Sequence, residues 1–213
     1  MSSLSIAEKY TLLTLNENGK FPAITQNYSA ISLIVAAISD LRFSEAISID
    51  DDKKVKIIGD LPGNLEFLRP IYEYLKDKGS LKPEKILEDY TMGFSNRFDE
   101  LLQSISNSLA AKGSVTREEK SGILGDKILF IPNDKEVEST VRELRDEILE
   151  DGNISDDNFL LSSILERGKQ LDKFFSQHES KMLKDKVEML RNTEASSLIK
   201  SMTDDMNAFI IAF

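Results

Sequence analysis

The residue types that carry most enzyme chemistry are sparse in this sequence. It contains one histidine, His178, and no cysteine, so disulfides, thiolate metal sites and cysteine nucleophiles are excluded. His178 stands in Ser-Gln-His-Glu with no nucleophile nearby in sequence, and we interpret it as a surface residue between two helices. The sequence has no glycine-rich phosphate loop, nucleophile elbow or HExxH pair. We therefore assign no catalytic residue and predict a protein that is not an enzyme.

Two acidic segments are candidates for a metal site. Glu150–Asp157 resembles a calcium loop, but it lacks the glycine at the sixth position and the terminal glutamate. A loop followed by a helix N-cap explains this segment better. Asp50–Asp52 is interpreted as the turn of a hairpin. We expect neither a metal nor a cofactor.

The net charge and the hydropathy pattern limit which anionic partners and membrane arrangements the sequence supports. The chain has 27 Lys and Arg against 37 Asp and Glu, a formal net charge of −10. Such a chain repels phosphate backbones on average, so an anionic partner needs a local basic patch, and the sequence shows none. The N-terminal residues lack the basic region, apolar region and cleavage site of a signal peptide, and the longest apolar stretches are far shorter than the roughly 20 residues of a bilayer span. We expect a cytoplasmic protein, peripheral on the cytosolic face if it meets a membrane.

A helical pattern that runs into a short hairpin pattern occurs twice. The first unit is Ala30–Phe43 followed by strands around Ile47–Ile49 and Val55–Ile57, which alternate apolar and polar residues. The second is Phe98–Lys112, with Ser95 as the predicted cap, followed by a hairpin that ends at Pro132. Such units bind DNA, bind membranes or mediate oligomer formation, so they indicate a protein that functions through a binding surface.

The remaining segments are also mainly helical in pattern. Ser5–Glu8 matches a capping box, Asn64 is a predicted N-cap, and Pro83 suits a first helical position. Further helical patterns follow the second hairpin, namely Val137–Ile148, Phe159–Phe175, Met182–Leu190 and Ala195–Phe213. No linker or repeat divides the chain. We predict one mainly α domain over residues 1–213, a helical bundle with two small projecting β-hairpins.

The order of these elements resembles the Golgi phosphoprotein 3 family, in particular its bacterial members that lack the N-terminal tail. The matching motifs are spread along almost the whole chain: Leu4–Glu8, Leu12–Gly19, Leu41–Asp50, Asp60–Asn64, Leu109–Glu118 and Asn207–Phe213. The resemblance implies a peripheral membrane protein that binds phosphatidylinositol 4-phosphate and acts as an adaptor. It also implies that the Thr116–Pro132 hairpin mediates homo-oligomer formation.

The headgroup residues of the family are not retained. The tryptophan of the family pocket falls near Thr25, and its arginines fall on about Ile34, Asp99 and Leu102. A phosphate pocket needs guanidinium or clustered ammonium groups, so these changes argue against the family ligand. The nearest remaining cation is Arg97, which we predict as the lipid-headgroup residue. Its alternative interpretation is a solvated helix charge.

Two functions from different classes remain open. The first is a non-enzymatic protein that binds a membrane surface, through a phosphoinositide or another anionic lipid, or a partner protein. The alternative is a winged-helix-like DNA-binding regulator, and the second helix–hairpin unit carries the cations Lys112, Arg117 and Lys120. Asp99, Glu100 and the net charge of −10 disfavour this alternative, so no nucleic acid is expected.

Overall fold

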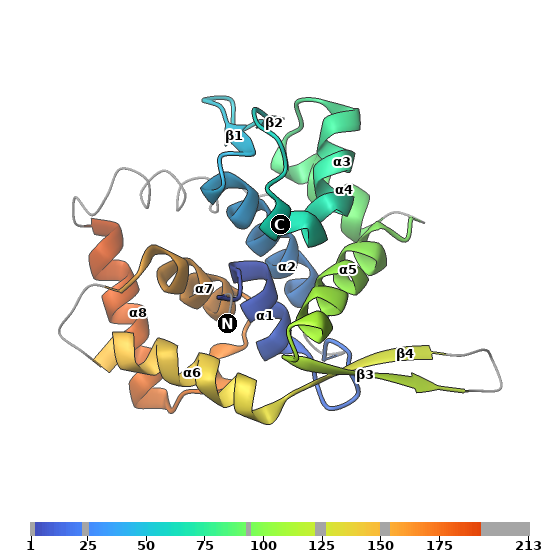
Figure 1. The fold of residues 1–213 in the computed structure, drawn as a ribbon. Coiled ribbons are helices and arrows are strands. Elements are labelled where there is room, and N and C mark those ends of the chain that lie inside the picture. Colours follow the sequence, from blue (N-terminus) through green and yellow to red (C-terminus); the bar gives the residue numbers. More distant parts are fainter. Residues whose placement is uncertain (1–2, 23–25, 93–94, 122–126, 150–153, 193–213) are drawn as a thin grey trace.

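The computed structural model describes residues 3–22, 26–92, 95–121, 127–149 and 154–192. Within these residues, helices form the body and two antiparallel hairpins project from it (Figure 1), which confirms the predicted fold class. The α-helices are α1 Ile6–Thr14, α2 Gln26–Phe43, α3 Arg69–Lys78, α4 Pro83–Thr91, α5 Arg97–Ala111, α6 Asp134–Leu149, α7 Asp156–Arg167 and α8 Gln177–Asn192. The strands are β1 Ile47–Ile49, β2 Val55–Ile57, β3 Val115–Lys120 and β4 Lys127–Pro132, and the short 3₁₀ helices are η2 Gly63–Leu68 and η3 Leu171–Lys173.

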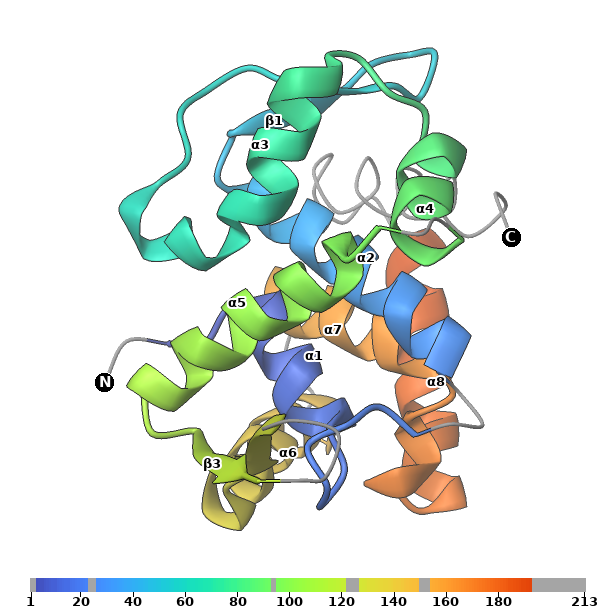
Figure 2. The ribbon, with the colours of Figure 1, turned by 90° about the vertical axis from the view of Figure 1, so that its right-hand side faces the viewer.

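Helix α1 lies at the centre of the body, against α2, α5 and α7 (Figure 2). All of its residues are buried, including the charged Glu8 and Lys9. The predicted capping box is confirmed: the Ser5 hydroxyl accepts from the Glu8 amide, and the Glu8 carboxylate accepts from the Ser5 amide at 2.9 Å. Helix α2 is buried from Ser29 to Leu41, as its nearly continuous apolar pattern predicts.

The two hairpins are attached differently. In the first, Ile47 pairs with Ile57 and Ile49 with Val55, which is the predicted alternation. Val55 is buried and exchanges two backbone hydrogen bonds with Leu81, so the second strand of this hairpin is fastened to the helical body. In the second, every β3 residue after Val115 is exposed, and Phe130 on β4 reaches the core. The self-association predicted for Thr116–Pro132 stays a prediction.

Two predicted helix starts are wrong, each for a local reason. Asn64 caps no α-helix, because it lies inside η2 and α3 begins only at Arg69. Pro70 has no amide to donate and is tolerated only in the first turn, so α3 does not extend back toward Leu65. Ser95 does not cap α5 either: its hydroxyl donates to the Asp89 carbonyl, and Asn96 takes the cap position.

The predicted single helix Phe159–Phe175 is interrupted. Helix α7 ends at Arg167, Lys169 adopts φ 57°, and its amide and that of Gln170 donate to the carbonyls of Glu166 and Leu165. This is the Schellman pattern that closes a helix, and η3 follows as a separate turn. His178 is exposed in the first turn of α8, not between helices.

Three further expectations concern the C-terminal helix, membrane-spanning segments and metal sites. The predicted helix Ala195–Phe213 lies outside the described residues. Among the residues that the structure describes, no helix combines the length and the apolar character needed to cross a bilayer. The same residues contain no group of three metal-ligating side chains arranged to hold an ion.

Candidate functional site

Arg97, the predicted headgroup residue, begins α5 and is partly buried. Its guanidinium carbon lies 5.4 Å from the centroid of the Tyr74 ring, a cation–π contact. The Tyr74 hydroxyl in turn donates to the Asp89 carboxylate at 2.9 Å. The pKa of Asp89 is lowered, chiefly by the hydrogen bond from Lys85, with a smaller contribution from Arg97. Arg97 is therefore engaged with the helical body, and its role toward a headgroup stays a prediction.

The other positions that correspond to the family pocket do not form a cationic site in the described structure. Ile34 is completely buried in the core, and Leu102 packs partly buried against it. Asp99 is exposed in the first turn of α5, where an acid favours the helix rather than an anionic ligand. Thr25 lies outside the described residues.

A cleft of about 470 Å³ opens beside the first turn of α1, and two buried carboxylates line it. Asp40 accepts from the amides of Ile6 and Ala7 at 3.0 and 2.9 Å and bonds the Ser5 hydroxyl at 2.7 Å. Burial raises the pKa of Asp40 to about 7. Because these oxygens already bind groups of the fold, we interpret Asp40 as a structural residue that closes the buried end of α1.

The second carboxylate at this end belongs to Glu8, whose side chain is completely buried. Glu8 accepts from the Lys112 ammonium at 2.6 Å and from the Ser108 hydroxyl at 2.8 Å. Both donors lie at the end of α5, so the bonds tie α1 to the helix that leads into the second hairpin. These contacts are also structural.

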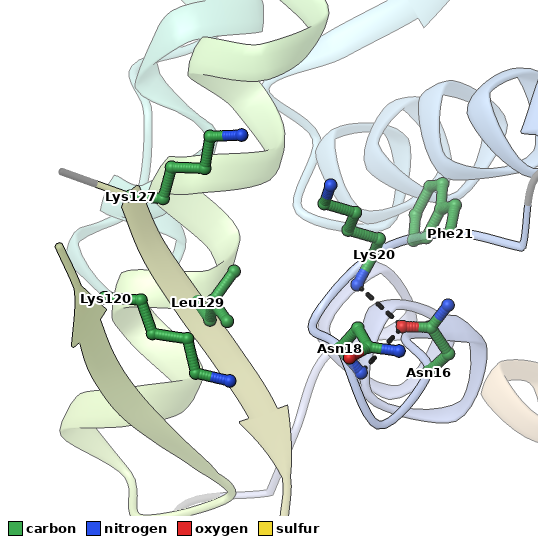
Figure 3. Close-up of a pocket in the computed structure, with 7 residues that line it drawn as sticks. All are labelled: Asn16, Asn18, Lys20, Phe21, Lys120, Lys127 and Leu129. Carbon is green, nitrogen blue, oxygen red and sulfur yellow. Dashed lines mark hydrogen bonds between the residues drawn. The ribbon is translucent and has the colours of Figure 1, made fainter. Parts of the chain in front are cut away.

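A different cleft, of about 450 Å³, lies between the loop after α1 and the second hairpin (Figure 3). Three exposed lysines line it, Lys20 from the loop, Lys120 from the end of β3 and Lys127 from the start of β4. The other lining residues are Asn16, Asn18, Phe21 and Leu129. Figure 3 shows the strand residues on one side of this lysine-lined cleft and the loop residues on the other.

The loop side of the lysine-lined cleft is a preformed turn. The Asn16 side-chain oxygen accepts from the amides of Asn18 and Lys20 at 2.9 and 3.1 Å, and the Lys20 carbonyl accepts from the Asn16 amide at 2.9 Å. An asparagine side chain that bonds the backbone two residues on is a common turn-forming device. The turn fixes where the Lys20 side chain leaves the backbone.

The hairpin side holds two like charges face to face. Lys120 and Lys127 are direct cross-strand partners, an arrangement that destabilises an antiparallel pair. In the described part of the chain, no carboxylate comes within ion-pair distance of Lys20, Lys120 or Lys127. Lysine ammonium groups bind phosphates as point charges with three donors each. The arrangement suits binding of an anion.

Sequence reasoning missed this site. It considered Lys120 only as one of the cations of a winged-helix-like unit, and it assigned no role to Lys20 or Lys127. No run of basic residues signals the cluster, because Lys20 is far from the other two in sequence. The paired positions of Lys120 and Lys127 at the two inner ends of a predicted hairpin were the one available signal.

The sequence was compared with models of protein families and with curated proteins. The model of the Golgi phosphoprotein 3 (GPP34) family matches residues 6–206, which include α1, both hairpins and all three lysines of the cleft. A search of curated proteins gave no match.

Proposed function

The chain belongs to the Golgi phosphoprotein 3 family, and from that premise we propose that it is a non-enzymatic, adaptor-type protein that binds anionic lipids at a membrane surface. The observation that supports this proposal is the lysine-lined cleft, where three lysines face one open space and, among the residues that the structure describes, form no ion pair with a carboxylate. Basic residues close to an anionic bilayer contribute about 1 kcal/mol each to binding. The cleft therefore takes the place of the cationic family residues that this chain lacks.

Because the net charge is negative, binding to an anionic membrane depends on the local cluster of Lys20, Lys120 and Lys127. A chain with a formal charge of −10 is repelled by an anionic surface at long range. At contact, charges beyond about one Debye length are screened, roughly 8 Å at physiological salt, and the nearest lysines dominate. We therefore expect binding that weakens steeply with salt and depends on which lysines are present rather than on the total charge.

Replacing Lys20, Lys120 and Lys127 together by glutamine is expected to weaken binding to anionic vesicles. At about 1 kcal/mol for each lysine, the affinity falls about a hundredfold. The measurement is co-sedimentation with phosphatidylcholine vesicles that contain phosphatidylserine or phosphatidylinositol 4-phosphate. Pure phosphatidylcholine vesicles give the background.

A matched control changes the same total charge elsewhere. Lys76, Lys78 and Lys82 are exposed near α3 and α4, and their glutamine variant should bind as the unchanged protein does. An equal loss of vesicle affinity in both triple variants would contradict the assignment of the lysine-lined cleft as the binding site. If the unchanged protein does not pellet with anionic vesicles, the proposed function is wrong.

An Arg97→Gln variant that loses more affinity than the cleft variant would assign headgroup binding to Arg97. If the unchanged protein binds duplex DNA in a gel-shift assay and does not bind vesicles, the winged-helix alternative is supported.

A further inference from the structure

The turn that carries Lys20 presses directly against the backbone of the second hairpin. Gly19 has φ +65°, and its amide donates to the Asn16 carbonyl at 2.8 Å. A Cβ atom built on Gly19 would lie 2.7 Å from the Phe130 nitrogen and 2.9 Å from the Phe130 oxygen. Real Cβ atoms do not come so close to another atom, so only glycine allows this contact.

Both partners of this contact are anchored in the core. Phe130 is 7% exposed and belongs to the hydrophobic core, although most of its hairpin projects into solvent. On the loop side, Phe21 is buried and packs edge-on against Tyr10, with ring centroids 6.4 Å apart, and against Phe98, at 6.0 Å. The turn is therefore held between the helical body and the hairpin. Its position determines how far Lys20 is from the two strand lysines.

We propose that Gly19 is a positioning residue, which fixes the second hairpin against the loop and so sets the geometry of the lysine-lined cleft. Asn16 contributes by holding the turn in shape through the two amides that its side chain accepts. This inference rests on the proposed function where it concerns anion binding, while the placement of the hairpin can be measured without a ligand. By thermodynamic reciprocity, an anion bound in the cleft then restrains the hairpin, and a displaced hairpin weakens the anion site.

The variant that tests this proposal is Gly19→Ala, and the chain contains a matched control. Gly79 also has a positive φ, +72°, but nothing lies within 4 Å of a Cβ at that position. Gly79→Ala therefore introduces strain at a positive φ without displacing the hairpin, and Gly19→Ala, which adds a contact with the Phe130 backbone, should show the larger fall in melting temperature. Only Gly19→Ala should lose affinity for phosphatidylserine vesicles, by about tenfold, the loss expected when one to two lysines leave the surface.

A distance measurement decides the proposal independently of vesicle binding. The chain has no cysteine, so spin labels can be placed on cysteines introduced at Glu118 on β3 and Lys76 on α3, both exposed. The distance between the labels should shift or broaden in Gly19→Ala and stay unchanged in Gly79→Ala. An unchanged distance in Gly19→Ala would overturn the proposal. If the unchanged protein binds no vesicles, the proposed function fails, and the distance still shows whether Gly19 positions the hairpin.

A second pair of variants covers the case in which Gly19→Ala does not fold. Asn16→Ala and Asn18→Ala each remove one side-chain carboxamide from the lining of the cleft. Of the two side chains, that of Asn16 accepts the backbone hydrogen bonds that hold the turn. Asn16→Ala should lower the vesicle affinity more than Asn18→Ala does, because Lys20 is no longer held. Equal effects of the two variants would overturn the positioning role of the turn.

Discussion

Replacing Asp40 by alanine is expected to lower the free energy of unfolding by about 3–5 kcal/mol. The substitution removes the acceptor of two backbone amides, those of Ile6 and Ala7, at the buried start of α1. A buried donor left without a partner costs about 1–3 kcal/mol, and the lost side chain leaves space as well. Because α1 contacts α2, α5 and α7, its first turn cannot loosen without disturbing the core.

Chemical denaturation measures this loss. Asp77→Ala is the control, because Asp77 is exposed in the last turn of α3 and its removal should change stability by less than about 0.5 kcal/mol. A loss of similar size in both variants would show that Asp40 does not hold the start of α1.

Asp40 also makes stability depend on pH in an unusual direction. Its pKa is raised to about 7 by burial, whereas an unfolded aspartate titrates near 3.8. Between these values the folded protein keeps a proton that the unfolded chain has lost, so stability falls as pH rises from about 4 to 7. A shift of about three pH units corresponds to about 4 kcal/mol.

The variant Asp40→Asn isolates this contribution from carboxyl groups such as Glu143, which titrate in the opposite sense. Burial raises the pKa of Glu143, but the hydrogen bonds from Lys9 and Asn158 outweigh it and leave that pKa lowered. The difference in unfolding free energy between the unchanged protein and Asp40→Asn should decrease from pH 4 to pH 7. A difference that stays constant over this range would show that Asp40 is ionised throughout.

The second large effect concerns Lys112, whose replacement by methionine should cost about 2–3 kcal/mol. Lys112 neutralises Glu8, whose side chain has no exposure to solvent, while the lysine side chain itself is 26% exposed. Removing one partner of a buried pair leaves an uncompensated charge, which costs about 3–5 kcal/mol when both partners are buried. The partial exposure of Lys112 reduces the expected value.

A double variant distinguishes lost charge from lost packing. Adding Glu8→Gln to Lys112→Met removes the stranded charge and should recover most of the stability, although neither change restores the ion pair. Lys76→Met is the control for removing a cation from the last turn of a helix, and it should have little effect. If Glu8→Gln made Lys112→Met less stable still, the buried charge would not be the cause.

Local patterns account for the parts of the fold that the sequence predicted. The capping box at Ser5, the buried α2 and the alternation in the first hairpin depend on neighbouring residues and on the periods of helix and strand. The errors arose where a residue had a competing partner. Ser95 bonds the Asp89 carbonyl instead of capping α5, and α7 ends at Arg167 because the amides of Lys169 and Gln170 donate back to its last carbonyls.

The sequence by itself determined a mainly helical protein with two hairpins, no cysteine chemistry, one histidine and a family resemblance that the family match confirms. Only the tertiary structure decided where cations gather. Arg97 stacks on Tyr74, while Lys20 meets Lys120 and Lys127 because a glycine lets the loop touch the hairpin backbone. Periodicity follows from local backbone geometry, but the convergence of distant charges depends on how the elements pack, which no local pattern contains.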